Sequence, residues 1–148
     1  MRLVIQRVIE ANVRVENRLI NEITSGLLIL VGIDRNDTAS DIIYSAKKIA
    51  NLKLLPTGTQ EFGNSILELG QSILLISEFT LLARTSKGSK LSFSKAAEKN
   101  IAKQLFDQLA DELKSLGIDV KTGVFGADMQ VASINNGPVT VWIDSQNI

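Results

Sequence analysis

The sequence predicts a mixed α/β fold in which two packed, largely antiparallel β-sheets carry two helices on one side, a three-layer α/β/β arrangement. About eight strand-like segments stand against only two helical ones. The helical segments do not alternate strictly with the strands, which argues against a doubly wound sheet. The 148 residues, 45% hydrophobic and 22% charged, fit one globular domain over residues 1–148.

The first part of the chain has the patterns of strands. Residues 2–9 and 12–16 alternate apolar and polar side chains, which is the period of a half-buried strand. Residues 16–18 indicate a hairpin turn into a strand over 19–23. Residues 26–33 are a continuous apolar run with a glycine near each end. This run predicts a central strand buried on both faces, with a helix as the competing interpretation.

The first helix is predicted behind a capping sequence. Residues 38–41, Thr-Ala-Ser-Asp, have the form of a capping box, and apolar residues follow at helical spacing as far as Asn51. Residues 52–55 then predict a short strand stopped by Pro56, and 57–65 a loop rich in turn residues.

The second half of the chain predicts another strand, a loop, a helix and the closing strands. Residues 72–79 predict a second central strand, and 83–93 a polar loop. A long helix is predicted from an N-cap at Ser94 to a C-terminal cap at Gly117, because apolar residues recur every four positions. Those apolar residues are Ala97, Ile101, Leu105, Leu109 and Leu113. The closing strands are predicted at Val120, 129–134 and 139–143.

Two missing residue types exclude whole classes of chemistry. The chain has no cysteine and no histidine, which excludes disulfides, a cysteine nucleophile and every Ser-His-Asp triad. A hydrolase of this composition must use backbone groups, hydroxyls, carboxylates, lysines or the substrate itself. No metal-ligand spacing is visible, so we expect no metal and no cofactor.

Charge and hydropathy predict a cytoplasmic protein. Residues 1–7 lack the layout of a signal peptide. The longest apolar run is far shorter than the roughly 20 residues that cross a bilayer, so we expect no membrane partner. Because the formal net charge is zero, a nucleic acid would bind at a local basic patch.

Two segments combine turn or strand-end positions with reactive groups. Residues 77–81, Ser-Glu-Phe-Thr-Leu, follow an apolar strand and predict a pocket, because sites are commonly built at strand ends. Their alternative role is an ordinary strand with Phe79 in the core. Residues 135–140, Asn-Asn-Gly-Pro-Val-Thr, predict a rigid turn that can act as a steric gate. The alternative is a plain hairpin between two closing strands.

Two further segments have nucleic-acid character. Residues 83–95 hold four basic residues among hydroxyls, which suits a phosphate backbone or, alternatively, a solvated loop. Residues 122–130 contain two glycines with Phe125 and Met129, which can pack against a base or lie at the edge of the core.

The order of these segments resembles the D-aminoacyl-tRNA deacylase family, also called the D-tyrosyl-tRNA deacylase family, over essentially the whole chain. Residues 4–8, 26–32 and 125–131 match family segments. Residues 77–81 correspond to the family's Ser-Gln-Phe-Thr pattern, and 136–140 keep its Gly-Pro-Val-Thr pattern. Members hydrolyse the ester of D-aminoacyl-tRNA, releasing free tRNA and the D-amino acid.

The resemblance also implies a site at the interface of a homodimer. A cis Gly137–Pro138 bond would enter the partner's pocket and reject L-aminoacyl esters by clash, with Arg7 holding that turn across the interface. The catalytic segment would include Ser77, Phe79 and Thr80, with the N–H groups of the last two stabilising an oxyanion.

Other substrate contacts are implied for three side chains. Phe125 and Met129 would lie by the terminal adenosine of tRNA, and Glu78 would lie in the catalytic segment. A Thr80 nucleophile competes with attack by water assisted by the terminal 2′-hydroxyl of tRNA. We favour the second, because a threonine hydroxyl without a histidine base is weakly nucleophilic. We expect no DNA partner.

The sequence departs from the family in three places. Glu78 replaces the family's glutamine, residues 89–93 lack a proline, and residues 60–64 differ from the family's Gly-Lys-Met-Asn pattern. Editing of glycyl-tRNA is a possible additional activity, since a gate against L side chains does not exclude glycine. The alternatives are a non-catalytic tRNA-binding dimer of the same fold and a structural oligomer.

Overall fold

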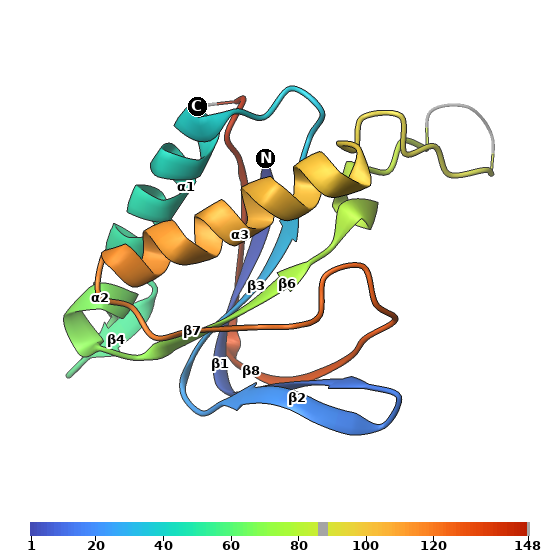
Figure 1. Ribbon diagram of the computed structural model, residues 1–148. Coiled ribbons are helices and arrows are strands. Elements are labelled where there is room, and N and C mark those ends of the chain that lie inside the picture. Colours follow the sequence, from blue (N-terminus) through green and yellow to red (C-terminus); the bar gives the residue numbers. More distant parts are fainter. Residues whose placement is uncertain (86–88, 148) are drawn as a thin grey trace.

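The computed structural model describes residues 1–85 and 89–147, and it has the predicted mixed α/β fold (Figure 1). Its strands are β1 (Arg2–Val15), β2 (Arg18–Ile23), β3 (Gly26–Gly32), β4 (Leu55–Thr57), β5 (Gln60–Asn64), β6 (Ser72–Ser77), β7 (Val120–Thr122) and β8 (Gln130–Asp144). Its helices are α1 (Ala39–Asn51), α2 (Ile66–Leu69), the 3-10 helix η1 (Phe79–Leu82) and α3 (Lys99–Ser115).

The apolar run near the start of the chain is the central strand β3, as predicted. It pairs antiparallel with β1 and parallel with β6, and the described sheet runs in the order β2-β1-β3-β6-β7. All of β3 except the half-buried Leu30 is buried. The continuous apolar character of this strand therefore reflects burial on both faces.

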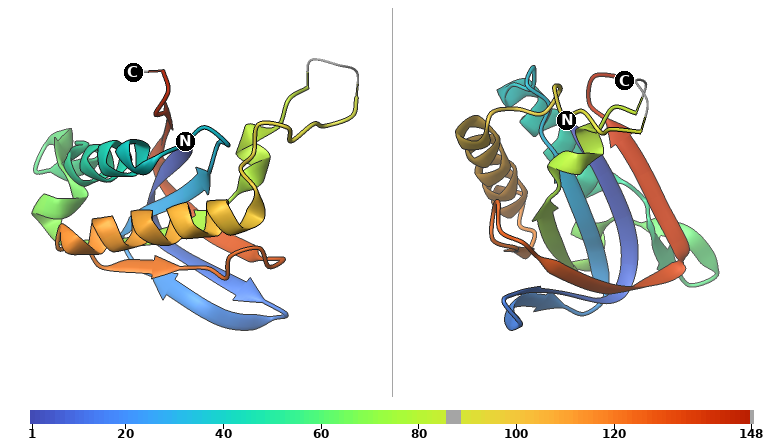
Figure 2. Two further views of the ribbon diagram at one scale, coloured as in Figure 1. Left: turned by 45° about the horizontal axis from the view of Figure 1, so that its top comes forward. Right: turned by 90° about the vertical axis from the view of Figure 1, so that its right-hand side faces the viewer.

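Two long strands connect the two layers of sheet. β8 pairs with β1 from Asp144 opposite Arg2 to Gln130 opposite Arg14. The other edge of β1 pairs first with β3 and then with β2. In Figure 2 (right) the β2 end of this ribbon lies across the strands of the main layer. The two predicted sheets are thus one bent, hydrogen-bonded sheet, because β1 and β8 run through both layers.

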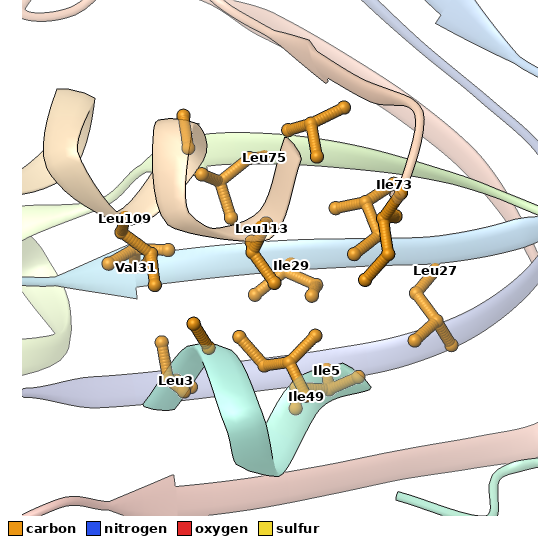
Figure 3. Packing of buried hydrophobic residues seen from close by; sticks show 14 of the residues in the cluster. Leu3, Ile5, Leu27, Ile29, Val31, Ile49, Ile73, Leu75, Leu109 and Leu113 are labelled. Carbon is orange, nitrogen blue, oxygen red and sulfur yellow. The ribbon is translucent and has the colours of Figure 1, made fainter. Parts of the chain in front are cut away.

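Apolar side chains fill both sides of the main layer. Helices α1 and α3 cover the same face of the sheet (Figure 1). Leu109 and Leu113 of α3 and Ile49 of α1 point toward Ile29 and Leu75 of the sheet (Figure 3). A second cluster lies between the two layers of sheet; it consists of Val8, Ala11, Val13, Ile23, Leu28, Leu74 and Ile76. These two clusters produce the three layers.

The helix boundaries agree with the sequence at α1 and differ at α3. The N–H of Thr38 donates to the Asp41 carboxylate at 2.9 Å, as a capping box requires. Helix α3 begins at Lys99 with Glu98 as its N-cap, so the prediction of a cap at Ser94 was wrong. The cause is tertiary: residues 94–95 form a turn, and the N–H of Ala97 then bonds to the carbonyl of Ile33 at 2.9 Å, which ties this stretch to the end of β3.

One predicted loop and one predicted turn lie within strands. Pro56 lies inside β4, which forms a hairpin with β5 where a loop was predicted. The segment 135–140 is no hairpin: Thr140 pairs with Gln6 and Asn135 with Val8, so this segment bulges out of the continuous strand β8.

Candidate active site

A pocket of about 560 Å³ opens where β6 ends, beside the start of α3 and the connection from β7 to β8. Ser77, Glu78 and Phe79 line one side of it, and Phe125 and Met129 line another. These five residues come from two segments almost 50 positions apart in the sequence. Its lining is mainly apolar with a few polar groups, which is the usual character of a small-molecule site.

The chain turns sharply after β6, in the segment 77–81. The N–H of Glu78 donates to the carbonyl of Val31 at 2.8 Å, which continues the pairing with β3 by one residue. The chain then enters η1, which packs so closely on Gly32 that a Cβ there would lie 2.4 Å from the Leu82 side chain. The Arg2 guanidinium also donates to the carbonyl of Leu81 at 2.8 Å. These contacts fix the start of η1 at the mouth of the pocket.

Backbone N–H groups are available at this turn. Phe79 and Thr80 are the first two residues of η1, where no carbonyl of the helix itself can accept from their N–H groups. Phe79 is 57% exposed, and its ring meets that of Phe93 edge-to-face at 4.9 Å between centroids. Thr80 is exposed, and its hydroxyl donates to the Glu78 carboxylate. Two adjacent donors therefore lie beside a hydroxyl and a carboxylate.

The opposite side of the pocket is built from glycines and two large side chains. Phe125 packs against Phe106 of α3, with 5.7 Å between ring centroids. A Cβ on Gly123 would lie 2.6 Å from the Met129 sulfur, so only glycine lets the thioether approach. Gly126 has a φ of +74°, which favours glycine. The glycines thus allow the connection to wrap closely around the pocket.

The Gly-Pro segment, residues 135–139, is held by Arg7 of the same chain. The Gly137–Pro138 bond is cis, as the family resemblance implies. The Arg7 Nε donates to the carbonyl of Asn136 at 2.9 Å, and the N–H of Val139 donates to the Asn135 side chain at 2.8 Å. Gly137 and Pro138 are exposed.

This segment and the pocket lie at opposite ends of β3. Arg7 pairs with Leu27, whereas the pocket is lined by Val31 and Ile33. Val31 lies four positions after Leu27, which is about 13 Å along a strand. The structure therefore brings Ser77, Glu78, Phe79, Phe125 and Met129 together, and it leaves Arg7, Gly137 and Pro138 apart from them.

An apolar area is exposed on the face of the sheet that the helices leave open. Trp142 is 56% exposed and pairs with Val4, which in turn pairs with Leu30 of β3. Val4 and Leu30 are both half-buried. We call Val4, Leu30 and Trp142 the open-face patch.

Sequence reasoning missed several pocket residues. Lys99, in the first turn of α3, and Asp128 also line the pocket. The sequence did not indicate that Lys99 lines the pocket, because its place there depends on α3 beginning at Lys99 and not just after Ser94. Of the basic loop, Arg84 and Lys90 are exposed and Lys95 is half-buried. Lys87 lies outside the described residues.

Neither a metal-binding cluster nor a membrane-spanning helix is present in the described ranges. There, no three Asp, Glu, His or Cys side chains converge on a point where they could hold a metal ion. None of the helices in residues 1–85 and 89–147 combines the length and apolar character needed to cross a bilayer.

Known structures resemble this fold over nearly its whole length. One, described as c-Myc DNA unwinding element binding protein, is 32% identical with a TM-score of 0.90, covering 97% of this chain and 98% of that one. A second, described as a probable eukaryotic D-amino acid tRNA deacylase, has a TM-score of 0.80 at 16% identity, covering 96% and 97%. The second likeness establishes the fold alone.

Sequence comparison identifies the family. D-aminoacyl-tRNA deacylase of Chloroflexus aurantiacus is 48% identical over 148 residues, covering 100% of this chain and 92% of that protein. D-aminoacyl-tRNA deacylase of Thermomicrobium roseum is 43% identical, covering 100% and 96%. The family model described as D-Tyr-tRNA(Tyr) deacylase matches residues 4–144. The chain therefore belongs to the D-Tyr-tRNA(Tyr) deacylase family of enzymes.

Proposed function

We propose that this enzyme hydrolyses the ester bond of D-aminoacyl-tRNA in the cytoplasm, releasing free tRNA and the D-amino acid and sparing L-aminoacyl-tRNA. The proposal rests on one observation. The catalytic segment and the residues that correspond to the adenosine-binding side of the family meet in a single pocket of about 560 Å³. That volume lies in the range of small-molecule sites, and it suits a terminal adenosine with an esterified amino acid.

The stereochemical gate is proposed to come from a second copy of the chain. The Gly-Pro segment lies about 13 Å along β3 from the pocket, so it cannot close the pocket of its own chain. It is exposed, as an inserting element must be. A two-fold dimer would bring each Gly-Pro segment to the partner's pocket and cover the open-face patch. The exposed ring of Trp142 supports such an interface, since large aromatic residues are enriched there.

The proposed chemistry uses the turn after β6. The N–H groups of Phe79 and Thr80 would donate to the carbonyl oxygen of the ester as it gains negative charge. Water would attack the carbonyl carbon with assistance from the 2′-hydroxyl of the terminal adenosine, and the 3′-oxygen would leave. Ser77 would line the ester. No cofactor is needed, because aminoacyl esters are intrinsically labile.

Thr80 is proposed to position groups and not to attack. Its hydroxyl donates to Glu78, and a carboxylate is a weak base for a threonine hydroxyl. A Thr80→Ala variant is expected to keep turnover. Loss of turnover in Thr80→Ala, with recovery and a trapped acyl-enzyme in Thr80→Ser, would establish a nucleophile instead. An unchanged pH–rate profile in Glu78→Gln would show that the Glu78 charge does not act on the substrate.

The tRNA is proposed to bind through its terminus and its phosphates. Phe125 and Met129 would pack against the adenine, and the basic residues of loop 83–95 would contact the backbone. Glycyl-tRNA would also be a substrate, because a gate against L side chains cannot reject a substrate that has none. We propose no role for DNA; competition by duplex DNA for tRNA binding would contradict this.

The test is deacylation of D-tyrosyl-tRNA and L-tyrosyl-tRNA at catalytic enzyme concentration. Rapid release from the D-ester, with the L-ester spared, supports the function and the gate. Salt-dependent tRNA binding with release from neither ester would identify a non-catalytic tRNA-binding dimer. Equal release from both esters would refute the gate and leave a non-selective hydrolase.

A further inference from the structure

Arg7 is the contact between the Gly-Pro segment and the β4–β5 hairpin. It is only 5% exposed, and its Nη1 donates to the carbonyls of Leu54 and Glu61, both at 3.0 Å. Its Nε donates to the carbonyl of Asn136, which directly precedes Gly137. A Cβ on Gly137 would lie 3.0 Å from Nη2, so the guanidinium packs directly against the gate. The guanidinium therefore limits the space into which Gly137 can move and holds the carbonyl that precedes it.

Two side chains of the hairpin fix the guanidinium. The Glu61 carboxylate accepts from Nη2 at 3.2 Å. The ring of Phe62 lies 5.8 Å from the guanidinium carbon, within the range of a cation–π contact. A nearly buried guanidinium needs a charged or polar partner on each side, and among the described residues Glu61 is its only carboxylate.

Neither of these two side chains is buried in the hydrophobic core. The Glu61 side chain is 60% exposed, and Phe62 is 54% exposed. An exposed phenyl ring and an exposed carboxylate contribute little to folding, yet both are directed at the same buried guanidinium. Their placement is explained if the position of Arg7 matters more than the stability of the hairpin.

From these contacts we infer that Glu61 and Phe62 are positioning residues for stereochemical selectivity, acting through Arg7 on the Gly137–Pro138 gate. The inference rests on the proposed function, in which that gate rejects L-aminoacyl esters. Without the carboxylate and the ring, Arg7 gains freedom to leave Asn136, and the gate then yields to an L side chain. The D-ester does not press on the gate, so its turnover is preserved.

The experiment compares kcat/KM for D-tyrosyl-tRNA and L-tyrosyl-tRNA in Glu61→Ala and Phe62→Ala. Each substitution is expected to lower the D-to-L ratio by about three- to tenfold, the range of one charge-assisted or cation–π contact. The change should come from a faster L-ester reaction. Glu61→Gln, whose amide oxygen still accepts from Arg7, should restore most of the ratio. Thr59→Ala, at the turn of the same hairpin, is the matched control and should leave the ratio unchanged.

The outcomes separate this inference from the proposed function. If the wild-type enzyme does not discriminate between the two esters, the proposed gate itself fails. If the wild type discriminates and both alanine variants keep its ratio, the gate stands and the role of Glu61 and Phe62 is refuted. Equal losses on both esters, with lower thermal stability, would show that the two residues only support the fold.

Discussion

The Gly137→Ala substitution tests the gate at a position where an added Cβ has little room. Gly137 has a φ of +131°, which L residues rarely adopt. An alanine Cβ would lie 2.7 Å from the Val139 side chain, 3.0 Å from the Arg7 guanidinium and 3.1 Å from the Val139 nitrogen. The chain must therefore shift away from Arg7 or from Val139, and either movement displaces the gate.

The cost follows from this geometry. A residue forced into such a backbone conformation costs roughly 1–3 kcal/mol, and the three close contacts place Gly137→Ala near the upper value. For a chain of this size each kcal/mol lowers Tm by about 2–4 °C, so we expect a fall of about 6–12 °C. Gly58→Ala is the matched control. Its φ is +52° and a Cβ there meets nothing within 4 Å, so only about 1–2 kcal/mol is lost.

Thermal unfolding and esterase selectivity are measured on both variants. We expect Gly137→Ala to lower the D-to-L ratio of kcat/KM, while Gly58→Ala keeps the wild-type ratio. Equal Tm values for the two variants would refute the steric reasoning. An unchanged D-to-L ratio in Gly137→Ala, in a wild type that discriminates, would refute the role of this glycine in selectivity.

Three further predictions concern the interface, acid stability and the pocket. Trp142→Glu places a charge on the open-face patch and should shift the protein toward monomer in analytical ultracentrifugation, with loss of D-selective activity; an unchanged dimer would contradict the assigned interface. A hydrogen bond from Lys53 lowers the pKa of Glu68 to about 2, and one from Ser72 lowers that of Asp119. The stability that these carboxylates contribute is present above their unfolded-state pKa of about 4 and is lost as pH falls through the lower folded-state pKa. Glu68→Gln with Asp119→Asn should therefore reduce the acid-induced loss of unfolding free energy between about pH 4 and 2; an identical profile to wild type would contradict it. Met129→Trp should fill the pocket and lower D-ester turnover at least tenfold, measured by release of tyrosine, whereas unchanged turnover would mean that the ester binds elsewhere.

Local pattern was sufficient for elements that carry a strong signal of their own. The strand β3 and the helix α1 were predicted from an apolar run and a capping box, because those signals lie within the segment itself. The hairpin at Glu16 and Asn17 was also predicted, and both residues have positive φ. Here the local preference and the tertiary fold agree.

The errors arose where a distant strand decides the conformation. Residues 135–140 are of the types that form turns, but a bulge in a strand uses the same residue types. Only the length of β1, which pairs with both halves of β8, distinguishes the two. Similarly, nothing in the residues after Ser94 reveals that Ala97 bonds to Ile33. Such pairings join segments far apart in the sequence, so no local pattern contains them.

The candidate site was partly predictable for the same reason. The segment 77–81 and the pair Phe125 and Met129 were selected for their chemistry, and the structure joins residues 77–79 of that segment with the pair in one pocket. The sequence predicted a loop where the β4–β5 hairpin lies, so the contacts of this hairpin with Arg7 could not be predicted. Its importance arises from a buried guanidinium that three distant segments share.

A measurement on mixed dimers tests whether the pocket of one copy is closed by the Gly-Pro segment of another. Gly137→Ala chains, which keep an intact pocket, are re-assembled with an excess of Met129→Trp chains, which keep an intact gate. We expect that L-ester hydrolysis by the Gly137→Ala chains is suppressed and that their D-to-L ratio returns toward the wild-type value. A ratio that stays at the value of Gly137→Ala alone, in dimers shown to be mixed, would contradict it.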